Sequence, residues 1–162
     1  MKKREKILVG MALGALWAIA VVALASLFPS TLFVPLNIAL IVGLLPGGLF
    51  LMLVIGRLAQ RRFLDDETID GEPFSVGSAA DIDQRVLTNT VEQLVLAMAL
   101  WPFVGLVLGG AAVLLLGIAF GIARVAFWIG YHRSRPLRAF GFAASFYPTV
   151  AASVWSALVW FV

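Results

Sequence analysis

The chain has 162 residues, of which 62% are apolar, only 13% are charged, and the net charge is +3. A soluble domain is roughly 45–50% apolar and about 25% charged, and a domain of this size leaves much of its surface exposed. The composition therefore excludes a soluble globular enzyme and a disordered chain, and it indicates that lipid surrounds most residues. Because the chain has no cysteine and one histidine, His132, it has no disulfide, thiolate metal site, cysteine nucleophile or histidine-rich metal site.

Five apolar runs, each long enough to cross about 30 Å of hydrocarbon, follow one another along the chain. They comprise residues 7–28, 31–56, 86–108, 111–131 and 139–162. A polar stretch separates the second run from the third, and there Ser78 and Asp81 are expected to cap a helix that starts near Ile82. Because the other connections are short, neighbouring helices must run antiparallel. The sequence thus predicts an all-α membrane bundle.

The basic residues predict the orientation of this bundle. They precede the first run, follow the second and separate the fourth from the fifth, whereas the connections at residues 29–30 and 109–110 are uncharged. Basic residues concentrate in cytoplasmic loops. We therefore expect the N-terminus and a loop at residues 57–84 to lie in the cytoplasm and the C-terminus outside.

The first run admits two interpretations, a membrane anchor or a cleaved signal peptide. A signal peptide also combines basic residues, an apolar run and a small-residue cleavage site such as Ala23-Leu24-Ala25. The apolar run is long for a signal peptide, so we predict that residues 1–30 form an uncleaved transmembrane anchor. Cleavage would leave the topology of the other four runs unchanged.

Five carboxylates in the polar stretch raise the question of a calcium site. They are Asp65, Asp66, Glu67, Asp70 and Glu72. Their spacing does not match the ligand pattern of an EF-hand loop. The sequence therefore predicts a solvated connector and no metal site.

Two ionisable residues lie well inside the apolar runs, Glu92 in the third and Arg124 in the fourth. An ionisable residue at such a depth costs at least ~2.5–3.5 kcal/mol on insertion scales, so each must face a partner or a water-filled cavity. Both lie roughly 10 Å along their helices from the predicted cytoplasmic end. They can therefore form an ion pair that only fixes helix register, or belong to a ligand site.

More polar side chains accompany these two than one ion pair requires. The set comprises Arg85, Asn89, Glu92, Arg124, Tyr131 and Arg138. Spacings of three, four and seven residues return to one face of a helix, although Pro136 interrupts the interval between Tyr131 and Arg138. With Arg133 and Arg135 nearby, the predicted mouth is cationic and contains one carboxylate. This favours a ligand with several carboxylates and an ammonium group over a cation.

The same residues resemble two motifs of the MAPEG superfamily, membrane-associated proteins in eicosanoid and glutathione metabolism. The segment Arg85-Val-Leu-Thr-Asn89-Thr-Val-Glu92 resembles the R-x-x-x-N-x-x-E signature on the family's second helix. Residues 123–138 are similar to the third-helix pattern of the leukotriene C synthase branch, in which an arginine, a tyrosine and an arginine follow at intervals of seven. The resemblance covers about residues 32–162.

The resemblance implies an architecture and a cofactor. It implies a four-helix transmembrane domain over residues 31–162, to which residues 1–30 add one helix, and a homotrimer. Family members bind glutathione between neighbouring subunits near the cytoplasmic face, so glutathione or a similar low-molecular-weight thiol is the expected cofactor. We expect a divergent member in a bacterial inner membrane, with the lipid bilayer and a lipophilic substrate as its other partners and no nucleic acid.

The resemblance also implies roles for individual residues. The positions that would bind glutathione are Arg85, Asn89, Glu92, Arg124 and Tyr131, with Glu92 at its ammonium group. Arg138 takes the place of the thiolate-stabilising arginine, and such a guanidinium lowers a thiol pKa from about 8.5 toward neutrality. An arginine at the end of the family's first helix also contacts glutathione, and Arg57, Arg61 and Arg62 are all candidates.

The chain departs from the leukotriene C synthase branch at three positions. Gln93 and Phe127 stand where that branch has tyrosines, and Leu87 replaces a polar residue. The charged residues of the motifs remain, so we expect a thiol-dependent transferase or peroxidase acting on lipophilic electrophiles, with Arg138 as its catalytic residue. The alternatives are a non-catalytic assembly protein that keeps the polar residues for folding, and a small transporter, which commonly has repeated halves that this sequence lacks.

Overall fold

A computed structural model describes residues 3–27 and 33–162, and these residues form five long helices. The helices are α1 (Lys3–Leu27), α2 (Leu36–Phe63), α3 (Ala79–Leu108), α4 (Gly110–Arg133) and α5 (Arg135–Phe161). Each is long and apolar enough to cross a membrane. The protein is therefore an all-α, multi-pass integral membrane protein, as its composition predicts.

The helix boundaries confirm one predicted cap and correct one predicted turn. The Ser78 side chain caps α3 by accepting a hydrogen bond from the backbone N–H of Asp81, at 3.1 Å. The basic turn predicted at residues 132–138 is shorter than expected, because α4 continues to Arg133 and α5 begins at Arg135. Pro136 lies in the first turn of α5, where a proline's missing N–H is not needed. The expected connection at residues 29–30 lies outside the described residues.

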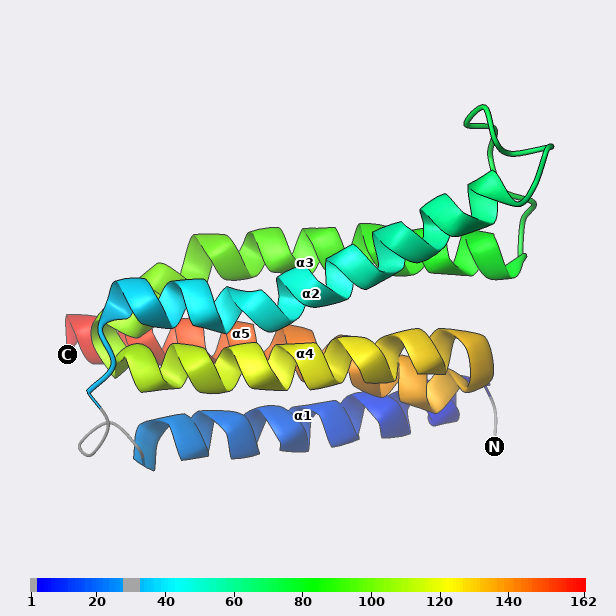
Figure 1. Cartoon of the computed structure of the whole chain (residues 1–162). Helices are drawn as coiled ribbons and strands as arrows, with labels where there is room; N and C mark the ends of the chain where they lie inside the picture. Colours follow the sequence, from blue (N-terminus) through cyan, green and yellow to red (C-terminus); the bar gives the residue numbers. More distant parts are fainter. Residues whose placement is uncertain (1–2, 28–32) are drawn as a thin grey trace.

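Each helix runs antiparallel to the next one along the chain, and their axes share one common direction (Figure 1). Helices α2 and α3 lie together on one side of α4 and α5, while α1 lies on the other side and packs mainly on α5. The loop between α2 and α3 and the turn between α4 and α5 are at the same end as the start of α1. The opposite end holds the α3–α4 turn at Gly109, whose φ of +88° favours glycine.

Close helix crossings at glycine set the relative positions of the helices. A Cβ on Gly117 of α4 would overlap the backbone of Gly43 in α2, and a Cβ on Gly130 of α4 would overlap the backbone of Arg138 in α5. Such small residues let helix backbones approach closely in membranes. The second crossing brings Arg138 beside Tyr131, which follows Gly130 on α4.

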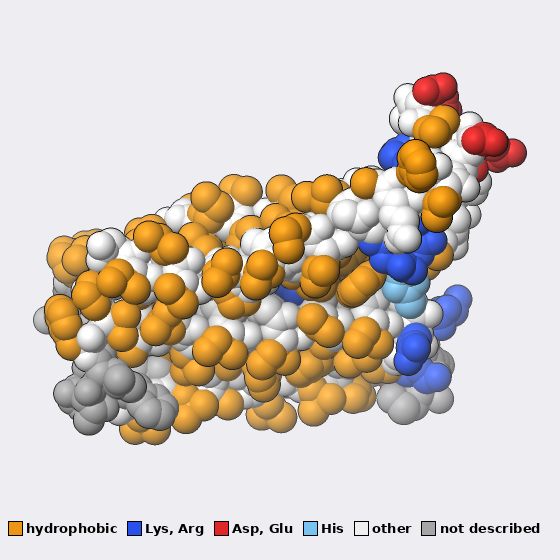
Figure 2. All heavy atoms as spheres, in the orientation of Figure 1, with side chains coloured by type: hydrophobic (Ala, Val, Ile, Leu, Met, Phe, Trp, Pro, Cys, Tyr) orange, Lys and Arg blue, Asp and Glu red, His pale blue; other side chains and the backbone are white. Residues whose placement is uncertain are grey.

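Apolar side chains fill the core and also cover the outside of the bundle. One buried cluster, around Trp101 and Phe120, draws on all five helices, and a second, around Phe50 and Val86, draws on α2, α3 and α4. Exposed leucine, isoleucine and valine side chains cover the length of the body, whereas the charged side chains gather at one end (Figure 2). This is the surface expected of helices that face lipid.

Candidate functional site

Arg124 lies fully buried at the centre of the bundle, between α3 and α5. Its guanidinium donates to Asn89 Oδ1 of α3 at 3.0 Å, and to the carbonyl oxygen of Gly141 at 3.2 Å and the Ser145 hydroxyl, both of α5. The Ser145 hydroxyl lies 2.6 Å from Gln93 Oε1, to which it donates. Neutral oxygens of two helices therefore hold this buried charge.

The ion pair considered between Glu92 and Arg124 is absent from the described part of the chain. Asn89 lies between the two residues, because its Oδ1 accepts from Arg124 and its Nδ2 donates to Glu92 Oε2 at 3.3 Å. The Glu92 side chain is exposed on the outer face of α3. One carboxylate is thus left on the surface of a helix that is long and apolar enough to span the membrane.

Two of the departures from the leukotriene C synthase pattern help to hold Arg124. Gln93 accepts the hydrogen bond from Ser145, and the Phe127 ring centroid lies 4.4 Å from the Arg124 guanidinium carbon. An aromatic face attracts a guanidinium at this distance. These substitutions therefore replace two expected hydroxyls by an amide and a cation–π contact.

Two buried donors in this network have no acceptor among the described residues. They are Arg124 Nε and Gln93 Nε2. A buried donor without a partner costs about 1–3 kcal/mol.

Three of the predicted site residues line one cavity of about 420 Å³. Its wall is formed by Ile7, Met11, Asn89, Phe127, Tyr131, Arg138, Ala139 and Phe142. The Arg138 guanidinium carbon lies 4.9 Å from the Tyr131 ring centroid, although the two residues are on different helices. Arg85 does not line this cavity. It is about half exposed and pairs with Asp81 at 3.0 Å, one turn earlier on α3.

A second polar cluster, not anticipated from the sequence, surrounds Asp83. This carboxylate is fully buried and receives Arg61 Nε at 2.9 Å, Trp128 Nε1 at 2.7 Å and His132 Nε2 at 2.8 Å. Arg57 Nε lies 3.7 Å away. The cluster ties α2, α3 and α4 together. The one available signal was spacing, since Arg57 and Arg61, like Trp128 and His132, are four residues apart and share a helix face.

The three arginines near the end of α2 differ in how tightly other residues of the chain hold their side chains. Arg61 is held by Asp83, and Arg62 donates to the carbonyl oxygens of Thr68 and Glu72 in the following loop. The Arg57 side chain is 48% exposed, and its contact with Asp83 is the longest. Of the three, Arg57 is the least constrained within the chain.

Comparison with known protein families gives a match that covers both motifs and four of the five described helices. The model of the MAPEG family matches residues 34–158. The chain belongs to the MAPEG family. In this MAPEG protein, α1 precedes the matched region, although it contributes Ile7 and Met11 to the cavity that contains Tyr131 and Arg138. Comparisons with curated proteins and with solved structures give no match.

Proposed function

We propose that this MAPEG protein is a glutathione-dependent transferase or peroxidase that acts on lipophilic electrophiles, with the thiol bound between subunits of a homotrimer. The observation that carries the proposal is the exposed carboxylate of Glu92 on a membrane-spanning helix. Within the described chain its one hydrogen-bond partner is the amide of Asn89. A carboxylate at this depth requires a partner, and a ligand ammonium group held against a neighbouring subunit would provide one.

Two charged side chains fit the chemistry of glutathione: Arg138 lines the cavity, and Glu92 does not line it but accepts a hydrogen bond from the wall residue Asn89. Glu92 matches the ammonium group of glutathione, while Arg138, which forms no ion pair within the described residues, matches an anionic group. The chain has no cysteine, so a reacting thiol must come with the ligand.

The chain's own residues would position and activate this thiol. When bound, glutathione supplies a sulfur nucleophile for conjugation or peroxide reduction. Arg138 would stabilise negative charge on that sulfur, because a neighbouring guanidinium favours a thiolate over a thiol. The Tyr131 ring packs against the guanidinium and limits its movement. The Phe127 and Phe142 rings and the side chains of α1 supply an apolar wall for the second substrate.

The homotrimer would complete the site. The exposed face of α3 that carries Glu92 is the surface that most needs cover from a second subunit. Arg57, which is half exposed, is the arginine of α2 best able to reach a ligand at such an interface. We therefore assign the family's first-helix arginine to Arg57.

A non-catalytic assembly protein is the second candidate. It is favoured by one observation, namely that Arg124 Nη1 and Nη2 both donate to acceptors of their own chain. A polar network built within one chain contributes to folding whether or not a thiol binds. Glutathione binding and thiolate formation separate the two candidates.

The test is a glutathione titration of the purified protein, with binding measured by calorimetry and thiolate by its ultraviolet absorbance. We expect Glu92→Gln to weaken binding about ten- to hundred-fold, since a hydrogen bond to a charged group contributes about 1.5–3 kcal/mol. Its control is Glu67→Gln, a loop carboxylate that lies outside the cavity. We expect Arg138→Ala to keep binding while thiolate at neutral pH falls about ten-fold, with Arg133→Ala as the control.

The possible results lead to different conclusions. Wild-type protein that neither binds glutathione nor forms thiolate would reject the enzyme and favour the assembly protein. Binding that is unchanged in Glu92→Gln would reject the role of the exposed carboxylate. Equal thiolate in wild type and Arg138→Ala would keep the binding site and remove Arg138 as its catalytic residue.

A further inference from the structure

A second cavity, of about 710 Å³, lies at the charged end of the bundle, where the start of α1 meets the turn between α4 and α5. We propose that this cavity binds the phosphate headgroup of an anionic bilayer lipid. Its wall is formed by Lys6, Val9, Gly130, Tyr131, His132, Arg133, Ser134, Arg135, Pro136 and Arg138. No carboxylate is among these described wall residues, so the cavity favours an anion.

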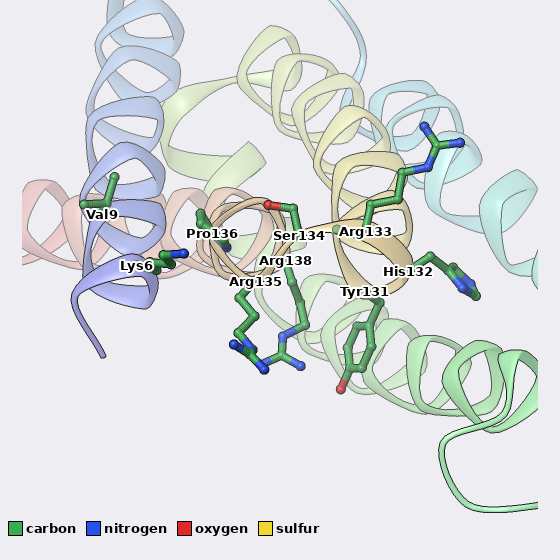
Figure 3. Close-up of a pocket in the computed structure, with 10 residues that line it drawn as sticks. Lys6, Val9, Tyr131, His132, Arg133, Ser134, Arg135, Pro136 and Arg138 are labelled. Carbon is green, nitrogen blue, oxygen red and sulfur yellow. The ribbon is translucent and has the colours of Figure 1, made fainter. Parts of the chain in front are cut away.

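Three cationic side chains, those of Lys6, Arg135 and Arg138, line this cavity from two helices, and Figure 3 shows how they lie. Arg135 and Arg138 extend from α5 in the same direction, and Lys6 of α1 points toward the start of α5. Tyr131 extends beside Arg138, whereas Arg133 and His132 point away from this group. The cavity therefore presents an ammonium and two guanidinium groups, and guanidinium forks match the oxygens of a phosphate.

Among the residues that the structure describes, these cations have no partner of opposite charge. Within residues 3–27 and 33–162, Lys6 and Arg135 form no ion pair and no side-chain hydrogen bond, and the Arg138 guanidinium contacts the Tyr131 ring. By contrast, Arg61 and Arg62 are bound to a carboxylate or to loop carbonyls. Unpaired like charges held around one cavity repel each other, and a bound anion would relieve that repulsion.

The position of the cavity favours a lipid over a free anion. It opens at the end of membrane-spanning helices, where the headgroups of a bilayer lie. Directly along α1 from Lys6, the side chains of Val9, Leu13 and Leu16 are exposed and apolar. A lipid whose phosphate lies between Lys6 and Arg135 would therefore place its acyl chains on this apolar surface of α1.

The proposed lipid site adjoins the thiol site and differs from it in Lys6 and Arg135. Lys6 belongs to α1, which precedes the region matched by the family, and neither Lys6 nor Arg135 lines the cavity that contains Asn89. Tyr131 and Arg138 line both cavities. The test therefore changes Lys6 and Arg135 and leaves the shared residues unaltered.

The experiment measures lipid binding to the protein in detergent by native mass spectrometry. The probes are phosphatidylglycerol, phosphatidylcholine with the same acyl chains, and inorganic phosphate. The test variant is Lys6→Gln with Arg135→Gln, both exposed residues whose replacement should not affect folding. The control is Lys3→Gln with Arg4→Gln, which removes the same charge from the same end of α1 outside the cavity wall.

We expect wild type and control to prefer phosphatidylglycerol over phosphatidylcholine. In the test variant, phosphatidylglycerol binding should weaken about five-fold for each charge, or about 25-fold in total, which corresponds to about 1 kcal/mol for each basic residue near a headgroup. Lys6→Arg should retain binding. The sequence predicts Arg135 near the mouth of the ligand site, but neither Arg135 nor Lys6 lines the cavity that contains Asn89. Glutathione affinity should therefore be equal in wild type and test variant.

Four results would overturn the proposal. Equal binding of the two lipids by wild type would show that the cavity does not select an anionic headgroup. Equal weakening in the control would show that any basic residue near the start of α1 attracts the lipid and that the cavity is not a specific site. Inorganic phosphate that binds as tightly as phosphatidylglycerol would assign the cavity to a free anion. Loss of glutathione affinity in the test variant would make the cavity part of the thiol site.

Discussion

Two buried charges are held in this protein by opposite means. Asp83 is surrounded by cationic and donor groups, whereas Arg124 is surrounded by neutral oxygens and an aromatic ring. The Asp83 cluster includes Arg61, whose side chain is 27% exposed, so water reaches part of it. Arg124 is not exposed at all.

Asp83→Asn should lower the free energy of unfolding by about 2–4 kcal/mol. The substitution leaves Arg61 without its counter-charge, and breaking a buried pair costs about 3–5 kcal/mol, which the partial exposure of Arg61 reduces. The measurement is denaturant unfolding in micelles. The control is Asp81→Asn, whose partner Arg85 is about half exposed, so a loss of at most about 1 kcal/mol is expected. Equal losses in both variants would contradict the structural role of Asp83.

At the scale of the elements, the helices are positioned by close backbone contacts. Gly43 and Gly117 bring α2 onto α4, and Gly130 brings α4 onto α5. Because glycine has no side chain, the helix backbones come into direct contact at these crossings. The predicted stripe of Arg124, Tyr131 and Arg138 does not continue along one helix, because α4 ends at Arg133. The α4–α5 crossing restores the contact between Tyr131 and Arg138.

Gly117→Ala should destabilise the protein by about 1–3 kcal/mol. The added Cβ would overlap the carbonyl group of Gly43, and backbone cannot rotate away as a side chain can. Gly56→Ala is the matched control, since a Cβ there meets nothing within 4 Å. Thermal unfolding in detergent, followed by circular dichroism, compares the two. A variant at position 117 as stable as the control would contradict the close crossing of α2 and α4.

At the scale of the whole molecule, the charged side chains are collected at one end of the bundle (Figure 2). That end contains the start of α1, the loop after α2 and the turn before α5, whereas the described α3–α4 turn at the other end has no charged residue. The structure thus places all the basic segments on the same side of a membrane. Because basic segments stay in the cytoplasm, we propose that this end is cytoplasmic.

The orientation can be measured directly because the chain has no cysteine of its own. In intact cells, Asp66→Cys should resist a membrane-impermeant maleimide and react once the membrane is permeabilised. Val162→Cys, at the other end of the molecule, should react in both conditions. The reverse pattern of labelling would contradict the proposed orientation.

The sequence by itself determined the class of the protein, its five spans and the end that carries the charges. Hydropathy and charge are properties of consecutive residues, so they can be summed along the chain without knowing which helices touch. The motif of Arg85, Asn89 and Glu92 likewise depends on spacing within one helix. The family match over residues 34–158 agrees with that interpretation.

Only the tertiary structure decided how the polar residues pair. Asn89, and not Glu92, contacts Arg124, and Asp83 collects partners from α2 and α4. These pairings depend on how far each helix is rotated about its axis, and a one-residue change in rotation moves a side chain by about 100°. Glycine crossings between distant segments set that rotation. For this reason, the exposed carboxylate of Glu92 and the cationic cavity beside Lys6 emerged only once the helices were packed.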